Sequence, residues 1–302
     1  MTTSRRAGQA GFTLVEMMVA LVIGLAVLGA SMSVAMASWQ SVRGTSLRDG
    51  MDRRARFIGL SLGRDVQEVG VDLDSDPADG ALVLASDTAI FLRVPYAPDA
   101  APAYPLSFGN FPDGQCGATC LEIVRDTSAL QLAAGDLARI QAGTVRRLIV
   151  VTGVQALSAT VVQVQFSNLG TLLHQAGGLA SLASGSRTFM QRLALVAYWR
   201  SGTQLMRAEQ VDATGALRGA VLAEGVPTWT VRLVFTDGDT LSAASGTEGD
   251  PINDYNEIVG IRFQSTLQAD RSDPRVNNGA LLLQTREWYL VPRNLVYQRN
   301  HF

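Results

Sequence analysis

The chain has no lysine and few residues of the types that usually carry chemistry. All 25 basic residues are arginine, and the 302 residues include two cysteines and two histidines, His174 and His301. No Walker-type glycine loop, G-x-S-x-G elbow or H-E-x-x-H pair occurs. A net charge of −2 also argues against a broad nucleic-acid-binding surface. We therefore expect a protein that is not an enzyme, with no resident cofactor.

Charge is also missing from one long segment near the amino terminus. Residues 17–42 contain no charged side chain, and residues 17–37 are almost entirely apolar. About 20 apolar helical residues cross a hydrocarbon core roughly 30 Å thick, so this segment predicts one transmembrane helix. Arg5 and Arg6 precede it, and Glu16 stands at its start.

Glu16 has two interpretations that are compatible with each other. A carboxylate in hydrocarbon costs about 2.5–3.5 kcal/mol on insertion scales, which makes an intramembrane acid a functional candidate. Residues 13–16, Thr-Leu-Val-Glu, also have the spacing of a capping box, and an acid in the first turn suits the helix dipole. The first interpretation predicts a role in assembly, and the second predicts a local role at the helix start.

The segment Gly11-Phe12-Thr13-Leu14-Val15-Glu16, with its basic leader and apolar helix, resembles a type IV pilin precursor. The resemblance implies that a prepilin peptidase cleaves between Gly11 and Phe12 and that Phe12 is then N-methylated. It further implies that Glu16 pairs with the Phe12 amine of a neighbouring subunit during filament assembly.

Later segments resemble PilW-type minor pilins. These are the hairpin at 196–207, the strand and Asp-Gly-Asp loop at 225–239, and the closing strand at 287–295. The resemblance implies a minor pilin that primes pilus assembly and lies at or near the fibre tip, with roles in cell adhesion and twitching motility. Implied partners are other minor and major pilins, the inner-membrane assembly platform and a tip adhesin. The implied location is the bacterial inner membrane, crossed once, and then the pilus fibre.

Two alternatives stay open. A minor pseudopilin of a type II secretion system would carry the same leader. Ala35-Met36-Ala37 also resembles a signal peptidase site, which would release a secreted binding or enzymatic domain after Ala37. Five arginines follow the apolar segment, so the positive-inside rule favours the orientation opposite to that of a pilin. They are Arg43, Arg48, Arg53, Arg54 and Arg56.

The chain divides into a leader at 1–11, a helix at 12–70 and a β-rich head at 71–302. Apolar residues at spacings of three and four continue the helix beyond the membrane segment. They are Leu47, Met51, Ala55, Ile58, Leu62, Val66 and Val69. We expect an α+β fold in which this long helix packs on a large antiparallel sheet, as in type IV pilins.

Short, often alternating apolar runs after Gly70 predict strands. The expected strands are 89–94, 121–125, 147–151, 159–166, 191–200, 204–210, 228–235, 257–267 and 286–296. Ser201-Gly202 predicts a tight hairpin between two of them.

Cys116 and Cys120 lie four residues apart, and a disulfide is the expected state for an exported protein. Two thiols without a nearby histidine make a poor metal site, so the bridge is expected to fix a loop.

Two acidic loops are weak calcium candidates. Asp72, Asp74 and Asp76 have the opening spacing of a calcium loop, but Pro77 replaces the usual glycine and Val83 the bidentate glutamate. Asp237 and Asp239 belong to a second acidic group. A solvated turn is the favoured interpretation of both loops.

Overall fold

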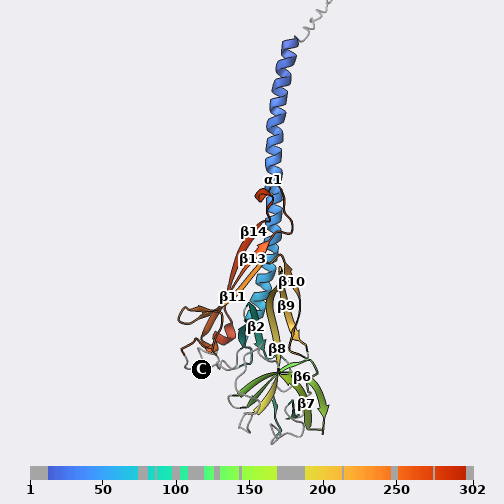
Figure 1. The fold of residues 1–302 in the computed structure, drawn as a ribbon, viewed down its shortest axis with the longest axis vertical. Helices are drawn as coiled ribbons and strands as arrows, with labels where there is room; N and C mark the ends of the chain where they lie inside the picture. The colour runs from blue at the N-terminus through green and yellow to red at the C-terminus, as the bar shows by residue number, and fades with distance from the viewer. Residues whose placement is uncertain are drawn as a thin grey trace, which may run out of the picture. The chain divides into compact units, whose positions relative to one another are not determined.

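The computed structural model describes residues 13–73, 81–85, 87–96, 103–107, 119–125, 130–142, 145–168, 188–212, 214–245, 251–274 and 276–296. Figure 1 shows the helix and strands of these residues. In chain order they are α1 (Leu14–Gln67), β1 (Leu82–Ala85), β2 (Thr88–Arg93), β3 (Tyr104–Pro105), β4 (Cys120–Val124), β5 (Leu137–Ala142), β6 (Val145–Ala156), β7 (Val161–Asn168), β8 (Thr188–Ser201), β9 (Gln204–Val211), β10 (Leu217–Glu224), β11 (Thr228–Phe235), β12 (Thr240–Leu241), η3 (Tyr255–Glu257), β13 (Ile258–Gln268), η4 (Asn277–Gly279) and β14 (Leu283–Leu290).

Helix α1 is one unbroken element of 54 residues. It contains no proline, so the backbone hydrogen bonds between each amide and the carbonyl four residues earlier continue along the whole helix. The helix ends where the chain reaches Gly70, whose φ of 74° is the left-handed conformation that a glycine adopts at little cost. The amide of Gly70 then donates to the carbonyl of Leu92, 2.9 Å away, and so joins the end of α1 to β2.

The chain forms two compact units. The first comprises Met1–Gly50 and Ala269–Leu282, so it holds most of α1 and the loop between β13 and β14. Within it, Arg43 Nη1 donates to Asp273 Oδ2 at 3.2 Å. The second unit comprises Met51–Gln268 and Leu283–Phe302. It contains the remainder of α1 and all of the described strands.

In the second unit, α1 buries one face. Met51, Ala55, Ile58, Leu62 and Val66 are buried, as the three- and four-residue spacing predicts, and Leu47 in the first unit is half-buried. This face packs on antiparallel strands: the side chain of Tyr198 in β8 meets Asp65 of α1. The expected α+β fold, with a long apolar helix and a large antiparallel sheet, is confirmed.

Strand β8 belongs to two groups of strands at once. Its second half pairs with β2 and β9, which continue to β1 and β10 respectively. Its first half pairs with β3 and β5, and β5 continues through β6 and β7 to β4. The bridge between Leu106 and Ile123 joins the end of β3 to β4. This bridge closes β8, β5, β6, β7, β4 and β3 into a small barrel.

The barrel encloses its own apolar core. Side chains from its strands gather in one buried cluster, with Leu132 added from the segment before β5. The strand members are Tyr104, Leu121, Ile123, Ala138, Ile140, Ile149, Val151, Val162, Val164, Phe166 and Met190. Closing strands into a ring is the usual way in which a small barrel removes sheet edges.

A second sheet has the order β12-β11-β13-β14. It packs on β2 of the first sheet through aromatic rings. Phe263 of β13 lies edge-on to Phe91 of β2, with centroids 6.4 Å apart, and it also contacts Trp229 of β11 at 5.6 Å. The indole nitrogen of Trp229 donates to the carbonyl of Asp87, which satisfies its one polar group.

Most of the predicted strands and the hairpin at Ser201-Gly202 are confirmed, the latter with φ of 60° at Gly202. The predicted strand 286–296 is wrong at its end, because β14 stops at Leu290. Pro292 has no amide hydrogen for a ladder, and 293–296 form a helical turn. The sequence analysis missed β1, β3, β5, β10 and β12.

Candidate functional site

The start of α1 has the geometry of a capping box. The amide and the hydroxyl of Thr13 both donate to Glu16 Oε2 at 3.0 Å, and the amide of Glu16 donates to Thr13 Oγ1 at 3.3 Å. The local interpretation of residues 13–16 is therefore present in the structure. Gly11 and Phe12, the expected cleavage and methylation positions, lie outside the described residues.

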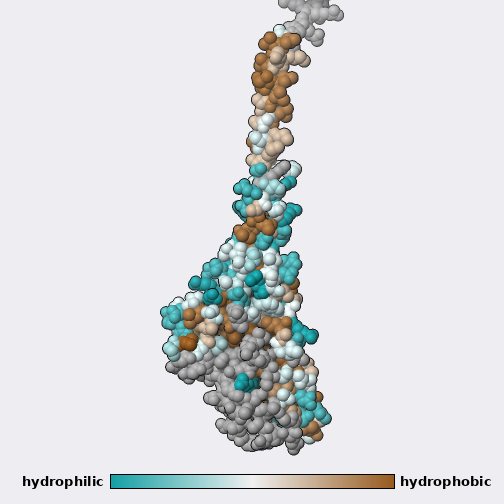
Figure 2. Space-filling view, viewed as in Figure 1, coloured by the Kyte–Doolittle hydropathy of each residue, from teal (hydrophilic) through white to brown (hydrophobic). Residues whose placement is uncertain are grey.

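The apolar half of α1 is uncovered. Among the described residues, α1 is the one helix long and apolar enough to cross a membrane, and none of its apolar window is buried. Figure 2 shows apolar surface around this part of the helix, followed by polar surface. Exposing so many large apolar side chains to water is unfavourable, so lipid or other helices must cover them.

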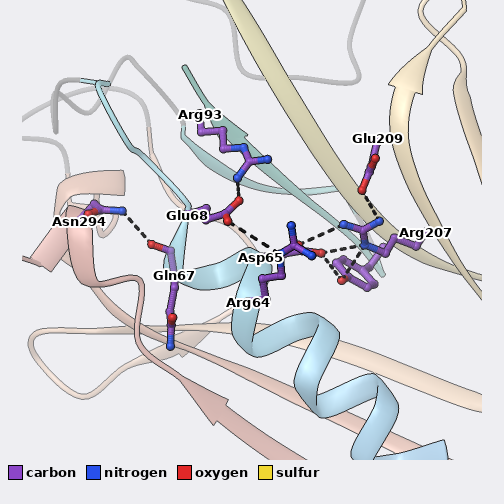
Figure 3. Close-up of polar contacts among 9 residues, drawn as sticks. Arg64, Asp65, Gln67, Glu68, Arg93, Arg207, Glu209 and Asn294 are labelled. Carbon is purple, nitrogen blue, oxygen red and sulfur yellow. Dashed lines mark hydrogen bonds and ion pairs between the residues drawn. The ribbon is translucent and has the colours of Figure 1, made fainter. Parts of the chain in front are cut away.

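The last turns of α1 are held to the strands by a buried carboxylate that the sequence analysis did not single out. Asp65 is 5% exposed and accepts two hydrogen bonds from Arg207 in β9, with Nε to Oδ2 at 2.8 Å and Nη2 to Oδ1 at 3.1 Å. Tyr198 in β8 also donates to Asp65. Burial and the bond to Asp65 raise the pKa of Tyr198 well above its usual value. Figure 3 shows Asp65 of α1 and Arg207 of β9 turned toward each other.

Two further contacts secure the end of α1 (Figure 3). Glu68 pairs with Arg93 of β2. The side-chain amide nitrogen Nδ2 of Asn294 donates to the carbonyls of Gln67 and Val69, at 2.8 and 3.2 Å. Asn294 therefore satisfies acceptors that a helix end leaves unpaired. In the sequence these residues read as ordinary polar positions, because their partners lie far away along the chain.

Two of the arginines that follow the apolar segment, Arg43 and Arg54, are engaged by the fold. Arg43 pairs with Asp273, and Arg54 Nη1 donates to the carbonyl of Glu224 at 2.8 Å. Asp52, on the same helix, pairs with Arg286 of β14. Two of the five arginines that oppose the expected orientation are thus tied to the folded chain.

The acidic loops contain no metal cluster in the part of the chain that the structure describes. Asp237 Oδ1 accepts the amide of Asp239 at 2.9 Å, and Oδ2 accepts the side-chain amide of Asn253 at 3.2 Å. These bonds are those of a turn. Asp74 and Asp76 lie outside the described residues, and Asp72 has a φ of 57° at the end of the helix turn. Calcium binding stays the less favoured interpretation of these loops.

Cys120 begins β4 and is 3% exposed and disulfide-bonded. Cys116, its expected partner, lies outside the described residues, as do His174 and His301. The pairing of Cys116 with Cys120 stays a prediction.

A cavity of about 410 Å³ opens beside β8, where β5 and β9 diverge. Two ion pairs lie at its lining: Arg192 lies 3.0 Å from Asp136, and Glu209 lies 2.5 Å from Arg207. Asp212 accepts the amide and hydroxyl of Thr214. The described lining holds no histidine, cysteine or serine that could act as a nucleophile.

Comparison with protein families gives one match, to the prokaryotic N-terminal methylation motif over residues 6–32. No curated protein matches the chain. The match supports a prepilin-type protein, similar to a type IV pilin or a pseudopilin, with a structural role. It also fits membrane anchoring through α1 and, in general terms, contacts with a prepilin peptidase and other pilins.

Proposed function

We propose that this protein is a minor pilin of a type IV pilus, of the PilW type, that primes pilus assembly and lies at or near the fibre tip. The observation that carries the proposal is the contrast between the two parts of α1. Its first part is apolar and wholly exposed, whereas from Met51 onward one face of the helix is buried against strands. The second part of the helix therefore packs within its own chain, whereas the first part must be covered by lipid or by another protein.

The N-terminal methylation motif at residues 6–32 supports a proposal for how the exposed part of α1 is processed and used. In the proposed order of events, the precursor is first held in the inner membrane by α1 and is then cut between Gly11 and Phe12. Methylated Phe12 and Glu16 then lie at the start of the helix. As the subunit joins the fibre, helices of neighbouring pilins replace lipid around residues 17–42.

Glu16 contributes to this step because its carboxylate and the new amine of Phe12 are opposite charges in a medium of low dielectric. Pairing Glu16 of one subunit with the Phe12 amine of its neighbour removes two unfavourable buried charges together. The bond between Glu16 and Thr13 holds the carboxylate within the first turn until that partner arrives.

The mature amino terminus tests the processing step. Mass spectrometry of the protein from cells with and without the prepilin peptidase should give an N-methylated Phe12 start only when the peptidase is present. A start at Ser38, independent of that enzyme, would show release after Ala37 and overturn the filament assignment. The unbroken course of α1 through residues 35–37 supports the first outcome.

Deletion of the gene tests which machine the protein serves. Loss of surface pili and twitching, with normal secretion of enzymes, is expected for a minor pilin. Loss of enzyme secretion with normal pili would assign the protein to a type II secretion system as a minor pseudopilin.

A further inference from the structure

The uncharged part of α1 is slightly longer than a hydrocarbon core, and an aromatic residue and a cation stand at its end. At 1.5 Å per residue, residues 17–42 rise about 39 Å. The hydrocarbon core is about 30 Å thick, and the bilayer with its headgroups is about 40–45 Å thick. When Glu16 lies in the headgroup layer of one leaflet, Trp39, about 34 Å further along the helix, reaches the opposite interface, and Arg43, about 40 Å along, reaches the opposite headgroups. Trp39 is 64% exposed, as an interfacial anchor should be.

A loop from the carboxyl-terminal part of the chain lies at the same level of the helix. Asp273, in the loop Ala269–Leu282, accepts a hydrogen bond from Arg43 at 3.2 Å. The amide of Ala269 donates to the carbonyl of Leu282 at 2.9 Å, which closes the base of the loop. Figure 1 shows this connection between β13 and β14 beside α1. We call Trp39, Arg43 and Arg48 together with this loop the collar.

The exposed side of the collar suits a headgroup layer. Arg43 is paired with Asp273, whereas Arg48 and Arg271 present exposed guanidinium groups. Asn278 adds an exposed side chain, and the side-chain amide of Asn277 donates to the carbonyl of Leu281 at 3.3 Å within the loop. Guanidinium groups bind phosphate oxygens with charge-assisted hydrogen bonds, and indole rings prefer the membrane interface. Asp49 and Asp270 are also exposed and offset the charge of these arginines. The attraction of the collar to lipid phosphates therefore depends on where the guanidinium groups lie more than on the net charge of the collar.

We propose that the collar rests on the phospholipid headgroups of the periplasmic leaflet while the subunit waits in the inner membrane, with Arg48 and Arg271 on lipid phosphates. The proposal rests on the proposed function, because an anchored subunit brings the collar to the lipid. The collar then fixes the depth of α1 before assembly. Entry into the fibre exchanges its lipid contacts for contacts with neighbouring subunits.

The test places a fluorophore in the loop. Full-length Ser272→Cys protein, labelled with an environment-sensitive dye under non-reducing conditions, is reconstituted into vesicles of phosphatidylethanolamine and phosphatidylglycerol. Thr236→Cys, an exposed position in the other unit, is the matched label control, and the wild-type chain controls for labelling of the native cysteines. Nitroxide-carrying headgroups then report contact with the lipid surface.

We expect strong quenching and a blue shift at position 272 and neither at position 236. Because one arginine near an anionic surface contributes roughly fivefold to binding, Arg48→Ala and Arg271→Ala should each weaken seating of the loop about fivefold. Arg56→Ala, an exposed arginine of α1 in the other unit, should leave the quenching unchanged.

A reconstituted protein whose loop label stays as accessible to water as the control label would overturn the collar proposal and leave the pilin assignment standing. Equal shielding of the label in detergent would also overturn the collar proposal, because protein and not lipid would then cover the loop. Failure of the protein to insert through α1 would contradict the proposed function itself.

Discussion

Trp288 of β14 lies directly against Gly59 of α1, so that a β-carbon at Gly59 would come within 2.6 Å of the indole nitrogen and 3.0 Å of Cδ1. Glycine is a poor helix former, and its presence here reflects the close approach of a strand to the helix. Four residues later, a β-carbon at Gly63 would meet nothing within 4 Å. The two glycines are thus a matched pair in one helix.

We predict opposite effects for alanine at these two positions. Gly63→Ala should raise the free energy of unfolding by about 0.5–1 kcal/mol, because alanine is the better helix former. Gly59→Ala should lower it by about 1–3 kcal/mol, because Trp288 must move. Urea unfolding of both variants measures the difference. A stabilised Gly59→Ala would mean that the indole moves aside freely.

The Asp65 cluster is predicted to contribute strongly to the stability of the head. Asp65→Ala leaves Arg207 and Tyr198 without their shared acceptor, and breaking a buried ion pair in this way costs about 3–5 kcal/mol. Asp49→Ala, at an exposed position on the same helix, should change stability by less than about 0.5 kcal/mol. Chemical denaturation of the two variants tests this, and similar losses would show that helix charge, not the cluster, is responsible.

Alkaline pH should destabilise the head. Burial raises the pKa of Tyr255 to about 12, and burial with the bond to Asp65 raises that of Tyr198. An unfolded tyrosine has a pKa near about 10, so the unfolded chain loses its protons first. The contribution of these phenols is therefore complete below about pH 10 and is lost as the pH rises through the folded-state values.

Unfolding midpoints measured across this alkaline range test the expectation. Tyr198→Phe and Tyr255→Phe should each flatten the decline, whereas Tyr289→Phe, at a residue 52% exposed, should not. An equal decline in all four proteins would mean that other groups govern it.

Two substitutions at Glu16 separate its local role from its role in assembly. Glutamine also forms capping boxes, so Glu16→Gln keeps the acceptor for Thr13 but removes the charge. We expect both Glu16→Gln and Glu16→Ala to be nearly absent from sheared fibres while the head stays folded. Quantitative immunoblots of fibres and membranes provide the measurement. Normal incorporation of Glu16→Gln would reduce Glu16 to a helix cap.

The bridge expected between Cys116 and Cys120 should stabilise the barrel modestly. A disulfide that closes so short a loop is worth about 2 kcal/mol in the chain-entropy account. Reduction, or replacement of both cysteines by serine, should lower the unfolding free energy by about that amount. Peptide mapping without reductant checks the pairing itself, and separate free thiols would refute it.

The sequence predicts the long helix, its buried face and most strands, because residues such as Ile58 and Leu62 repeat with the helix period. It does not predict the Asp65 cluster or the collar, whose members meet only after folding: Asp65 and Arg207 lie 142 positions apart, and Arg43 and Asp273 lie 230 apart. Strand β10 escapes prediction because it is an exposed edge strand with two register shifts, so it lacks a clean alternation.

Closure of the barrel shows the same limit. Strand β3 has two residues, too few for any pattern, yet Tyr104 and Pro105 pair with β8 and the adjacent Leu106 bridges to Ile123. A ring of strands is a property of distant pairings, and no local run of residues encodes it.

The sharing of β8 has a mechanical consequence. A fibre that pulls on a surface carries tension, and in this chain the single 14-residue strand β8 pairs with β3 and β5 of the barrel and also with β2 and β9. Tension applied along β8 loads its hydrogen bonds to β2, β5 and β9 in shear, so that many must break together and not one after another. In the proposed pilus fibre, β8 would therefore transmit a pulling force between the two groups of strands that share it.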